Sequence, residues 1–597
     1  MAKWMVAAKK ADFSKIAEEF DITPMTARLL RNRDLIQEDE IRAYLHGGLE
    51  SLGDPHMLAD MDKAVQILQR KILEHKKIRV IGDYDVDGIC SSYILLSGIR
   101  FCGGSVDCML PDRIRDGYGL NEELIRNALE ENTDTILTCD NGIAAFQQVV
   151  FAKAHDMTVI VTDHHEIPFE TDEKGGETKE ILPPADAVVD PKRADSAYEF
   201  REICGAVVAF RLLQVLMEQN DMQVHSKEEC KAFMDEMLEF AALATVCDVM
   251  ELRGENRVIV KEGLRRIQHS QNAGLRALIH VNQLEEKKIS CYHLGYIIGP
   301  CLNATGRLDS ALRGLALLTA DNPQEAARIA GDLKALNDSR KDMTGQSVDE
   351  AVSIVEKYSE LPSVLVIFLP ECHESIAGIV AGRIREKYGR PTLVLTRAED
   401  GVKGSGRSVP AYDMYRELNR CSDLFTRFGG HKMAAGLSMK EADIQELKKR
   451  LNDACTLQKN DFEEILHIDM EMPLPYADMK LIHEISLLEP FGNGNARPLF
   501  AVRNVSILSG RILGRNRNCG KYKIMDEIGQ KYDMIYFGDM DKWQRFLEEK
   551  FGTEQIDRIY SGADLQRNAV KINMAYYPDL NSYQGRESLQ IVMTDYM

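Results

Sequence analysis

Acidic residues directly follow three short apolar runs of this chain, and their placement constrains the fold more than any other feature. The runs are Ile78–Gly82, Asp134–Thr138 and Met157–Thr162. Each is rich in β-branched residues and is separated from the next by a helical pattern, which predicts βαβ units in a parallel sheet. Ala187–Val189 predicts a further strand. The groups that follow the first three runs are Asp83, Asp85 and Asp87, then Asp140, then Asp163, His164 and His165.

These groups are typical of a metal centre. In an open parallel sheet, ligands bind outside the carboxyl ends of the strands, where all three groups are expected to lie. Carboxylates with few imidazoles suit Mg²⁺ or Mn²⁺, and their number is sufficient for two ions. Two ions ~4 Å apart can stabilise both the attacking and the leaving oxygen of a phosphoryl transfer. A single Asp after a strand is commonly a turn residue or helix cap, but three such groups with a His pair favour metal binding.

Composition places the chain among globular proteins. Of its 597 residues, 44% are hydrophobic and 28% charged, which excludes collagen-like, low-complexity and wholly disordered chains. The length predicts about two to four domains. No apolar run approaches the ~18 residues that span a bilayer, and the first residues lack the apolar stretch of a signal peptide. The 13 cysteines form no Cys-x-x-Cys pair, which favours a reducing cytoplasm over disulfides or a zinc site.

The formal net charge of −20 does not exclude a nucleic-acid partner, because net charge says nothing about local patches. The stretch from Lys403 to Lys432 contains six Lys or Arg residues and three acidic residues, which gives it a local net charge of +3. Two glycine-rich segments there carry cations, Gly404–Arg407 and Phe428–Lys432. Glycines let backbone N–H groups approach an anion, so the stretch suits a groove that binds a nucleic-acid strand. A solvated helix face is the simpler alternative.

The remaining patterns divide the chain. Helical patterns run from Asp12 through Ile41 and around Met61–Leu73, and the polar segment Glu170–Glu180 predicts a surface loop. Asn322-Pro-Gln-Glu325 is a helix start, followed by helical spacing to about residue 358. Strands are expected at Ser363–Phe368 and Pro391–Thr396.

Alternating β-type residues after Asp461 predict a small antiparallel barrel. They include Tyr522–Met525, Asp533–Phe537, Ala569–Met574 and Ser588–Met593. Cations and aromatic rings lie close together in this region, as in barrels that bind single strands, although aromatic residues in a small barrel are more often core. These residues are Arg511, Arg515, Arg517, Lys521 and Lys523, with Tyr522, Tyr532, Tyr536 and Phe537.

Several segments resemble a known family. Gly82–Gly88, Asp140–Gly142, Asp163–His165 and Ala244–Asp248 resemble the four motifs of the DHH phosphoesterase superfamily. Within it, the chain is similar to the RecJ family of single-stranded-DNA exonucleases, in the family's order, from about residue 55 to the C-terminus. The segments that carry this closer resemblance are Leu110–Leu120, Ile203–Ala209, Asn303–Arg307, Gly378–Arg383, Gly404–Arg407, Gly429–Gly436 and Pro490–Asn495.

The resemblance implies an α/β architecture in four parts. Residues 1–322 would hold N-terminal helices and a DHH catalytic domain with a parallel sheet, and 323–358 a long linker helix. Residues 359–458 would form a smaller α/β DHH-associated domain, and 459–597 a nucleic-acid-binding OB-type β-barrel.

The resemblance also implies roles for individual residues. Asp140 would be shared by both metal ions, His165 would contact the scissile phosphate or leaving oxygen, and Asp163 would orient an imidazole. Cys301 stands where a basic residue is expected, which removes one phosphate contact. The implied metal ligands are Asp83, Asp85, Asp87, Asp140, His164 and Asp248, and the implied catalytic residues are Asp140, His164 and His165. The implied phosphate and DNA contacts are Asn303, Arg307, His373, Arg383, Ser405, Arg407, His431 and Lys432.

The function implied is a 5′→3′ exonuclease in DNA repair and recombination that hydrolyses single-stranded DNA to 5′ mononucleotides with two Mn²⁺ or Mg²⁺ ions. A cytoplasmic protein with no membrane partner is expected, and a single-stranded-DNA-binding protein and a helicase as partners. Two alternatives remain. One is a DHH phosphodiesterase of short oligoribonucleotides or cyclic dinucleotides, against which the barrel-like region argues. The other is an inactive DHH scaffold that binds DNA, against which the filled ligand positions argue.

Overall fold

The chain folds into two compact units. The computed structural model describes residues 2–113, 119–171, 178–218, 225–398, 401–514, 517–561, 570–583 and 586–597. The larger unit comprises Gly48–Phe462 and Gly492–Gly494. The smaller unit comprises Met1–Gly47, Glu463–Phe491 and Asn495–Met597. Arg515, Ala569 and the centre of the Leu110–Leu120 motif lie outside the described residues. Among the described residues, no helix combines the length and apolar character that a membrane span requires.

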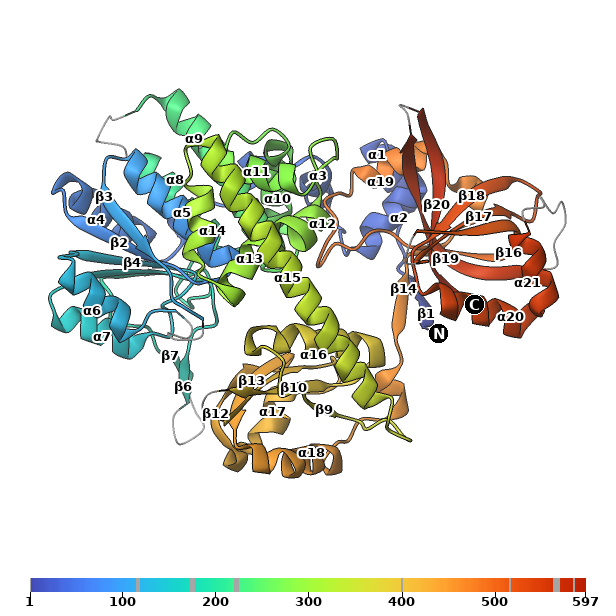
Figure 1. Cartoon of the computed structure of the whole chain (residues 1–597). Helices are drawn as coiled ribbons and strands as arrows, with labels where there is room; N and C mark the ends of the chain where they lie inside the picture. Colours follow the sequence, from blue (N-terminus) through green and yellow to red (C-terminus); the bar gives the residue numbers. More distant parts are fainter. Residues whose placement is uncertain are drawn as a thin grey trace. The chain divides into compact units, whose positions relative to one another are not determined.

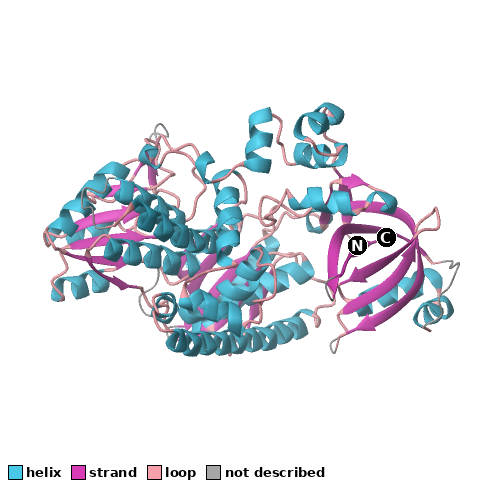
Figure 2. Cartoon of the chain, turned by 90° about the horizontal axis from the view of Figure 1, so that it is seen from above, coloured by secondary structure: helices cyan, strands magenta, loops and turns pink. Residues whose placement is uncertain are grey.

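The larger unit contains the expected parallel sheet. Its five strands lie in the order β3-β2-β4-β5-β8, and every pair is parallel. Successive side chains point to opposite faces, so Val80 and Ile81 of β2 lie in different hydrophobic cores. Figure 2 shows helices beside the strands on both sides. The strands are β2 Lys77–Ile81, β3 Ser105–Met109, β4 Thr135–Cys139, β5 Thr158–Thr162 and β8 Ala187–Val189.

Helices connect these strands and continue after the sheet. The core on one face is formed with α4, α5, α8 and α9, and that on the other face with α6 and α7. The helices before and between the strands are α4 Met61–Leu73, α5 Val86–Phe101, α6 Glu122–Glu130 and α7 Phe146–Ala154. Those that follow the last strand are α8 Gly205–Glu218, α9 Lys227–Cys247, α10 Gly254–Ile267, α11 Ala273–Val281, α12 Cys291–His293, the π-helical turn η3 Leu294–Ile298, α13 Gly299–Leu308 and α14 Leu312–Leu318.

Two elements of this part differ from the sequence-based expectation. The edge strand β3 was not predicted, because its polar residue Asp107 interrupts the apolar pattern. Asp107 pairs at 2.7 Å with Arg79 of β2, whose side chain is buried. The segment expected to be a surface loop instead contains a short antiparallel pair, β6 Phe169–Thr171 with β7 Thr178–Glu180.

The linker is one continuous helix, α15 Pro323–Val355, of 33 residues. It begins as its sequence indicates, since Oδ1 of the N-cap residue Asn322 accepts the backbone N–H of Gln324 at 2.8 Å. Its first half packs on α11 and α13, and it also contacts α16, which lies against the second sheet. Figure 1 shows this helix reaching the second sheet of the larger unit.

The second sheet of the larger unit is mixed. Its order is β12-β13-β11-β10-β9, and only the β9–β10 pair is parallel. The strand β12 is the edge, and it carries glycines and mostly exposed side chains. The elements are β9 Leu365–Phe368, α16 Glu374–Tyr388, β10 Thr392–Ala398, β11 Gly401–Arg407, α17 Met414–Asn419, β12 Phe425–His431, β13 Ala434–Met439 and α18 Ile444–Asp453.

The smaller unit contains the expected barrel. Strands β16, β17, β18, β20 and β19 pair in that order, and β19 pairs back with β16 to close the barrel. All of these pairs are antiparallel except β18–β20. The short strand β15 Met470–Glu471 pairs in parallel with the start of β16. The remaining elements are β16 Phe500–Leu513, β17 Cys519–Met525, β18 Lys531–Tyr536, β19 Lys571–Tyr583, β20 Arg586–Tyr596, α19 Met479–Ser486, α20 Met540–Phe551 and α21 Thr553–Tyr560.

The N-terminal segment belongs to the smaller unit, whereas the sequence-based division placed it with residues 1–322. The helices α1 Phe13–Phe20, α2 Pro24–Asn32 and α3 Glu38–His46 share a hydrophobic core with the barrel. The first strand, β1 Lys3–Val6, pairs in parallel with β14 Ile465–Ile468. In addition, the carboxylate of Glu484 accepts the N–H of Thr23 at 3.0 Å. The amphipathic helices of this segment therefore bury their apolar faces against the far end of the chain.

Candidate metal centre and adjoining cation pocket

The carboxyl ends of the parallel strands bring the predicted acids together. Asp83 follows β2, Asp140 follows β4 and Asp163 follows β5, and they expose only 1%, 3% and 1% of their surface. Asp140 has a left-handed backbone, with φ of 57°, a conformation that is uncommon outside glycine and often marks functional sites. Asp248, the residue after α9, joins them from the helical side.

Three overlapping groups of ligand atoms form at this edge, and within each group the atoms lie within 4.8 Å of one another. Asp140 belongs to two of the groups, as does His164, so these two residues connect the set. Nε2 of His164 lies 3.1 Å from Oδ1 of Asp140 and 3.5 Å from Oδ2 of Asp87. The groups are Asp83, Asp85 and Asp140; Asp87, His164 and Asp248; and Asp140, His164 and His165.

The electrostatics of these acids fit divalent cations. Burial and the neighbouring Asp85 raise the pKa of Asp83 to about 8. Burial and the neighbouring Asp87 raise the pKa of Asp248 to about 8 as well, and the pKa of Asp140 is raised in the same direction for the same reasons. Oδ1 of Asp83 is buried without a hydrogen-bond partner among the described residues. Burying several carboxylates together without a compensating charge costs free energy unless a cation binds. Their oxygen atoms are ligands that suit Mg²⁺ or Mn²⁺.

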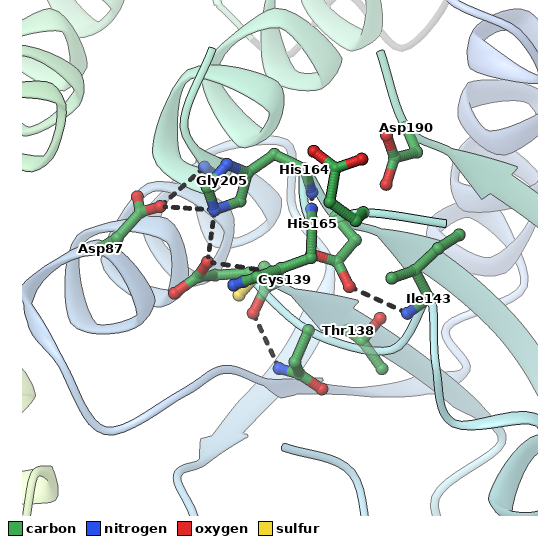
Figure 3. A network of polar contacts seen from close by, with 12 residues as sticks. Asp87, Thr138, Cys139, Ile143, His164, His165, Asp190 and Gly205 are labelled. Carbon is green, nitrogen blue, oxygen red and sulfur yellow. Dashed lines mark hydrogen bonds and ion pairs between the residues drawn. The ribbon is translucent and has the colours of Figure 1, made fainter. Parts of the chain in front are cut away.

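Backbone N–H groups hold two of the acids in place. Both oxygens of Asp87 accept backbone amides at the start of α8 at 2.7 Å, Oδ2 from Gly205 (Figure 3) and Oδ1 from Ala206. A Cβ at position 205 would lie 2.7 Å from the Cβ of Asp140, so glycine is required for this close approach. Asp85 caps α5 by accepting the N–H of Gly88 at 3.1 Å. The same acids thus serve as helix caps and as members of the ligand groups.

Asp163 orients the histidine pair. Its Oδ1 lies 2.7 Å from Nδ1 of His165 and accepts the backbone N–H of His164 at 2.7 Å. Its Oδ2 accepts the N–H of Ile143 at 2.8 Å, an interaction drawn in Figure 3. Burial alone would lower the pKa of His165, but the hydrogen bond to Asp163 raises it to about 9. Burial lowers the pKa of His164, which keeps its imidazole neutral and able to bind a metal.

Asp190 is a further acid of this edge that the sequence analysis did not select. It follows β8, and it is fully buried near Asp163 and His165 (Figure 3). Burial and the charge of Asp163 raise its pKa to about 8. One oxygen accepts the N–H of Lys192 at 2.8 Å, and the other has no partner among the described residues. The rule that selected the other acids, an Asp directly after a predicted strand, would have found it.

A cavity of about 380 Å³ adjoins this centre and is lined by cations. Arg307 of α13 and Arg407 of β11 line it together with Arg113. Nη1 of Arg307 donates to the carbonyl of Ser375 at 2.7 Å, and this hydrogen bond connects α13 with α16. Burial, together with the neighbouring Arg113, Arg340 and Arg407, lowers the pKa of Arg307 to about 10. Guanidinium groups that repel one another in this way are suited to bind a phosphate.

The cavity and the acid cluster share a wall. The guanidinium of Arg113 lies 5.0 Å above the ring of Tyr84, the residue between Asp83 and Asp85. A Cβ at Gly306 would collide with the carbonyl of Tyr84, so α13 passes directly beside the first acidic motif. A bound phosphate would therefore lie close to the acid cluster.

The structure brings some of the predicted phosphate contacts to this cavity and leaves others outside it. Arg307, Ser405 and Arg407 line the cavity, and sequence reasoning missed the further cations Arg113, Lys403 and Arg427. Arg113 lies in the Leu110–Leu120 segment that resembles the RecJ family, and Lys403 and Arg427 belong to the stretch of local positive charge, so these two signals could have found all three. The predicted contacts that do not line it are Asn303, His373, Arg383, His431 and Lys432.

Local structure explains two of these positions. His373 is the N-cap of α16, and its Nδ1 accepts the N–H of Ser375 at 3.3 Å. Cys301 is fully buried, and its Sγ lies 3.6 Å from the amide nitrogen of Asn337. On the other side of that amide, Arg340 donates to Oδ1 of Asn337 at 2.8 Å. A cation from the linker helix thus lies near the position where the sequence lacks one.

Comparison with known proteins identifies the family. Residues 77–245 match the DHH family N-terminal domain, 361–457 the DHHA1 domain and 468–595 the RecJ OB domain. The single-stranded-DNA-specific exonuclease RecJ of Salmonella typhimurium is 32% identical over 596 residues, which cover 96% of both chains. The chain belongs to the RecJ family. Its RecJ relative from Bacillus subtilis is 32% identical over 533 residues, and the chain spans 65% of that relative's length.

Solved RecJ structures agree with the fold. The structure of RecJ from Thermus thermophilus in complex with Mn²⁺ matches with a TM-score of 0.79 at 26% identity, and covers 100% of this chain and 79% of that chain. A crystal structure of exonuclease RecJ bound to manganese matches with a TM-score of 0.57 at 32% identity, and covers 68% of this chain and 97% of that one. The α/β fold class with its terminal OB barrel is thereby confirmed.

Proposed function

We propose that this chain is a metal-dependent exonuclease that hydrolyses single-stranded DNA from the 5′ end to 5′ mononucleotides. The observation that carries the proposal is the cation-lined cavity of about 380 Å³ beside the connected ligand groups. A terminal phosphate in the cavity would place the adjacent phosphodiester next to the acid cluster. The names of the relatives, single-stranded-DNA-specific exonucleases, support the choice of substrate.

The chain's own residues would hold two Mn²⁺ or Mg²⁺ ions. The proposed ligands are Asp83, Asp85, Asp87, Asp140, His164 and Asp248, with Asp140 shared. Bound ions of this kind polarise the phosphodiester and supply hydroxide near neutral pH. The backbone amides on Asp87 and the hydrogen bond from Asp163 to His165 fix these side chains in advance, so little reorganisation is needed when substrate binds.

His165 would contact the reacting phosphate. Asp163 holds its Nδ1, which leaves the other ring nitrogen to donate to a phosphate oxygen or to the leaving oxygen. Arg307, Arg407 and Ser405 would bind the 5′ phosphate and position the strand. A terminal phosphate bound in this cavity would place the first phosphodiester beside the acid cluster and so favour exonucleolytic cleavage, whereas the proposed 5′ polarity rests on the resemblance to the RecJ family. Asn303, His373, Arg383, His431 and Lys432 would contact the strand outside the cavity.

The wider setting is also part of the proposal. The barrel would bind the single strand beyond the active centre, and a single-stranded-DNA-binding protein and a helicase are the partners we expect during repair and recombination. All 13 cysteines lie in the described part of the chain and none forms a disulfide, which supports a reducing cytoplasm. The divisions at residues 322, 358 and 458 remain our boundaries for the catalytic, linker, DHH-associated and OB regions.

The test is digestion of 5′- and 3′-labelled single-stranded DNA, duplex DNA and RNA, with Mn²⁺ or Mg²⁺. We expect release of a labelled mononucleotide from the 5′ end of single-stranded DNA before any signal from the 3′ label. Asp140→Asn is the matched inactive control, since it keeps the side-chain shape. Initial release from the 3′ end, or preference for short RNA or cyclic dinucleotides, would contradict the proposal and favour the phosphodiesterase alternative.

A further inference from the structure

Two large aromatic side chains stack on each other at the surface of the larger unit. The ring centroids of Tyr292 and Tyr296 lie 5.3 Å apart, and the rings are inclined by 25°. Tyr292 exposes 62% and Tyr296 70% of its surface. An exposed pair of parallel aromatic faces is the type of surface on which nucleic-acid bases stack.

The pair lies on the same helical segment as Arg307 of the cation pocket. Helix α12, the π-helical turn η3 and α13 form one continuous segment, Cys291–Leu308. Positions 292, 296, 300, 303 and 307 follow one another at helical spacing, and all are exposed or half-buried, whereas most residues between them are buried. From Tyr292 to Arg307 the segment rises by roughly 22 Å.

This segment passes directly beside the metal centre. At its C-terminal end, α13 packs on the carbonyl of Tyr84, between Asp83 and Asp85. At its N-terminal end, Sγ of Cys247, the residue before Asp248, lies 3.6 Å from the carbonyl of Leu294. The π-helical turn widens the helix at this point, and such turns are frequent at functional sites. A strand held at Arg307 and cleaved at the acid cluster would therefore continue toward the tyrosines.

We propose that Tyr292 and Tyr296 form a base-stacking platform for the nucleotides on the 3′ side of the scissile bond. The inference rests on the proposed function, since it assumes a strand with its 5′ end in the cation pocket. Stacking on aromatic rings tolerates every base, which suits an enzyme that degrades any sequence. Burial and the nearby charge of Lys287 both lower the pKa of His293, so Lys287 adds positive charge beside the pair.

The platform predicts a length-dependent effect on KM. In the double variant Tyr292→Ala/Tyr296→Ala, we expect KM for a 20-nucleotide strand to rise about tenfold or more, because each base–ring stack is lost. The kcat should stay within twofold of wild type, and a dinucleotide, too short to reach the platform, should be cleaved as before. Tyr292→Phe/Tyr296→Phe keeps both rings and should behave like wild type. A KM that is unchanged for the long strand, or raised equally for the dinucleotide, would overturn the proposal.

A binding experiment separates this inference from the proposed activity. A single abasic site is moved along a 20-nucleotide strand, and affinity is measured by fluorescence anisotropy in Ca²⁺, without added Mn²⁺ or Mg²⁺. We expect an abasic site at one or two positions to weaken binding to the wild-type protein about tenfold. The same abasic sites should not weaken binding to the double Ala variant. If the wild type cleaves from the 5′ end but the scan is flat, the platform is wrong and the activity stands. If the coupled positions appear in a protein that cleaves no DNA, the platform stands and the activity is wrong.

Discussion

Oδ1 of Asp163 lies 2.7 Å from Nδ1 of His165, and the same oxygen accepts the backbone N–H of His165 at 3.2 Å. The carboxylate therefore fixes both the backbone and the ring of the histidine proposed to contact the reacting phosphate. It does so from a buried position, exposing 1% of its own surface, so water does not compete for the interaction.

Asp163→Asn should separate orientation from metal binding. An amide cannot supply the same negative charge, so the pKa of His165 should fall from about 9 toward its ordinary value. We expect kcat to fall about 10- to 100-fold, the usual effect of losing such an orienting partner. An NMR titration of His165 in metal-free protein checks the pKa. If the pKa of His165 falls as expected but kcat is unchanged, His165 takes no part in the mechanism.

Asp140→Ala should abolish hydrolysis while strand binding in metal-free buffer is largely retained. Asp140 belongs to two of the three ligand groups, so its loss affects both proposed ions. Hydrolysis rates in Mn²⁺ and anisotropy in EDTA are the two measurements. Activity within tenfold of wild type would show that the ions do not share this ligand.

Metal removal should make the stability of the protein depend on pH. In the unfolded chain, Asp83 and Asp248 ionise near pH 4, but in the folded chain their pKa values are about 8. The folded state therefore binds more protons across this interval, and the stability it gains at low pH is lost as pH rises toward about 8. The Tm of the metal-free protein should fall between pH 5 and 8.5.

Added Mn²⁺ should raise this Tm more at high pH than at low pH, because the ligands must be deprotonated. The control for this effect of Mn²⁺ is Asp140→Asn, which replaces one carboxylate of the proposed site by an amide. An equal rise of Tm at both values of pH would contradict a site built from these acids.

Arg407→Ala and Lys432→Ala should differ, although both residues lie in the glycine-rich segments. Arg407 lines the cavity, whereas Lys432 is exposed after the edge strand β12. Loss of a phosphate contact should flatten the plot of log affinity against log salt by about 0.7 for a single strand. We expect this change for Arg407→Ala, equally for two unrelated base sequences, and a smaller one for Lys432→Ala. Parallel plots for wild type and Arg407→Ala would exclude a phosphate contact at Arg407.

Phe537 and Tyr522 should respond differently to substitution in the barrel. Tyr522 is buried in the core with 1% exposure, and Tyr532 and Tyr536 expose only 9% and 8%, whereas Phe537 exposes 64% of its surface. Phe537→Ala should weaken binding of long strands about fivefold or more without changing Tm. Tyr522→Ala should cost about 3–5 kcal/mol of stability. Equal loss of Tm in both variants would argue against a stacking role for Phe537.

Sequence patterns predicted the elements whose apolar residues follow a regular period. The buried strands β2, β4 and β5 are instead short, nearly continuous apolar runs, which were also recognised, and α15 shows helical spacing after a start marked by Asn322. The edge strand β3 was missed because an ion pair between Arg79 and Asp107 replaces apolar burial. Arg113 lies in the Leu110–Leu120 motif segment but was not selected as a phosphate contact, because only the fold brings it above the ring of Tyr84 and into the cavity.

The packing of Met1–Gly47 with the barrel has a consequence for synthesis of the protein. These helices emerge from the ribosome long before the residues that cover their apolar faces, which begin at Glu463. At about 5–20 residues per second, the nascent chain waits roughly 20–80 s for this partner. The segment from Gly48 to Phe462 can fold during that time, because its contacts are made within itself. The helices of Met1–Gly47 are therefore translated well before they can complete their core, and until then Phe20 and Leu29 lack the cover that the barrel gives them.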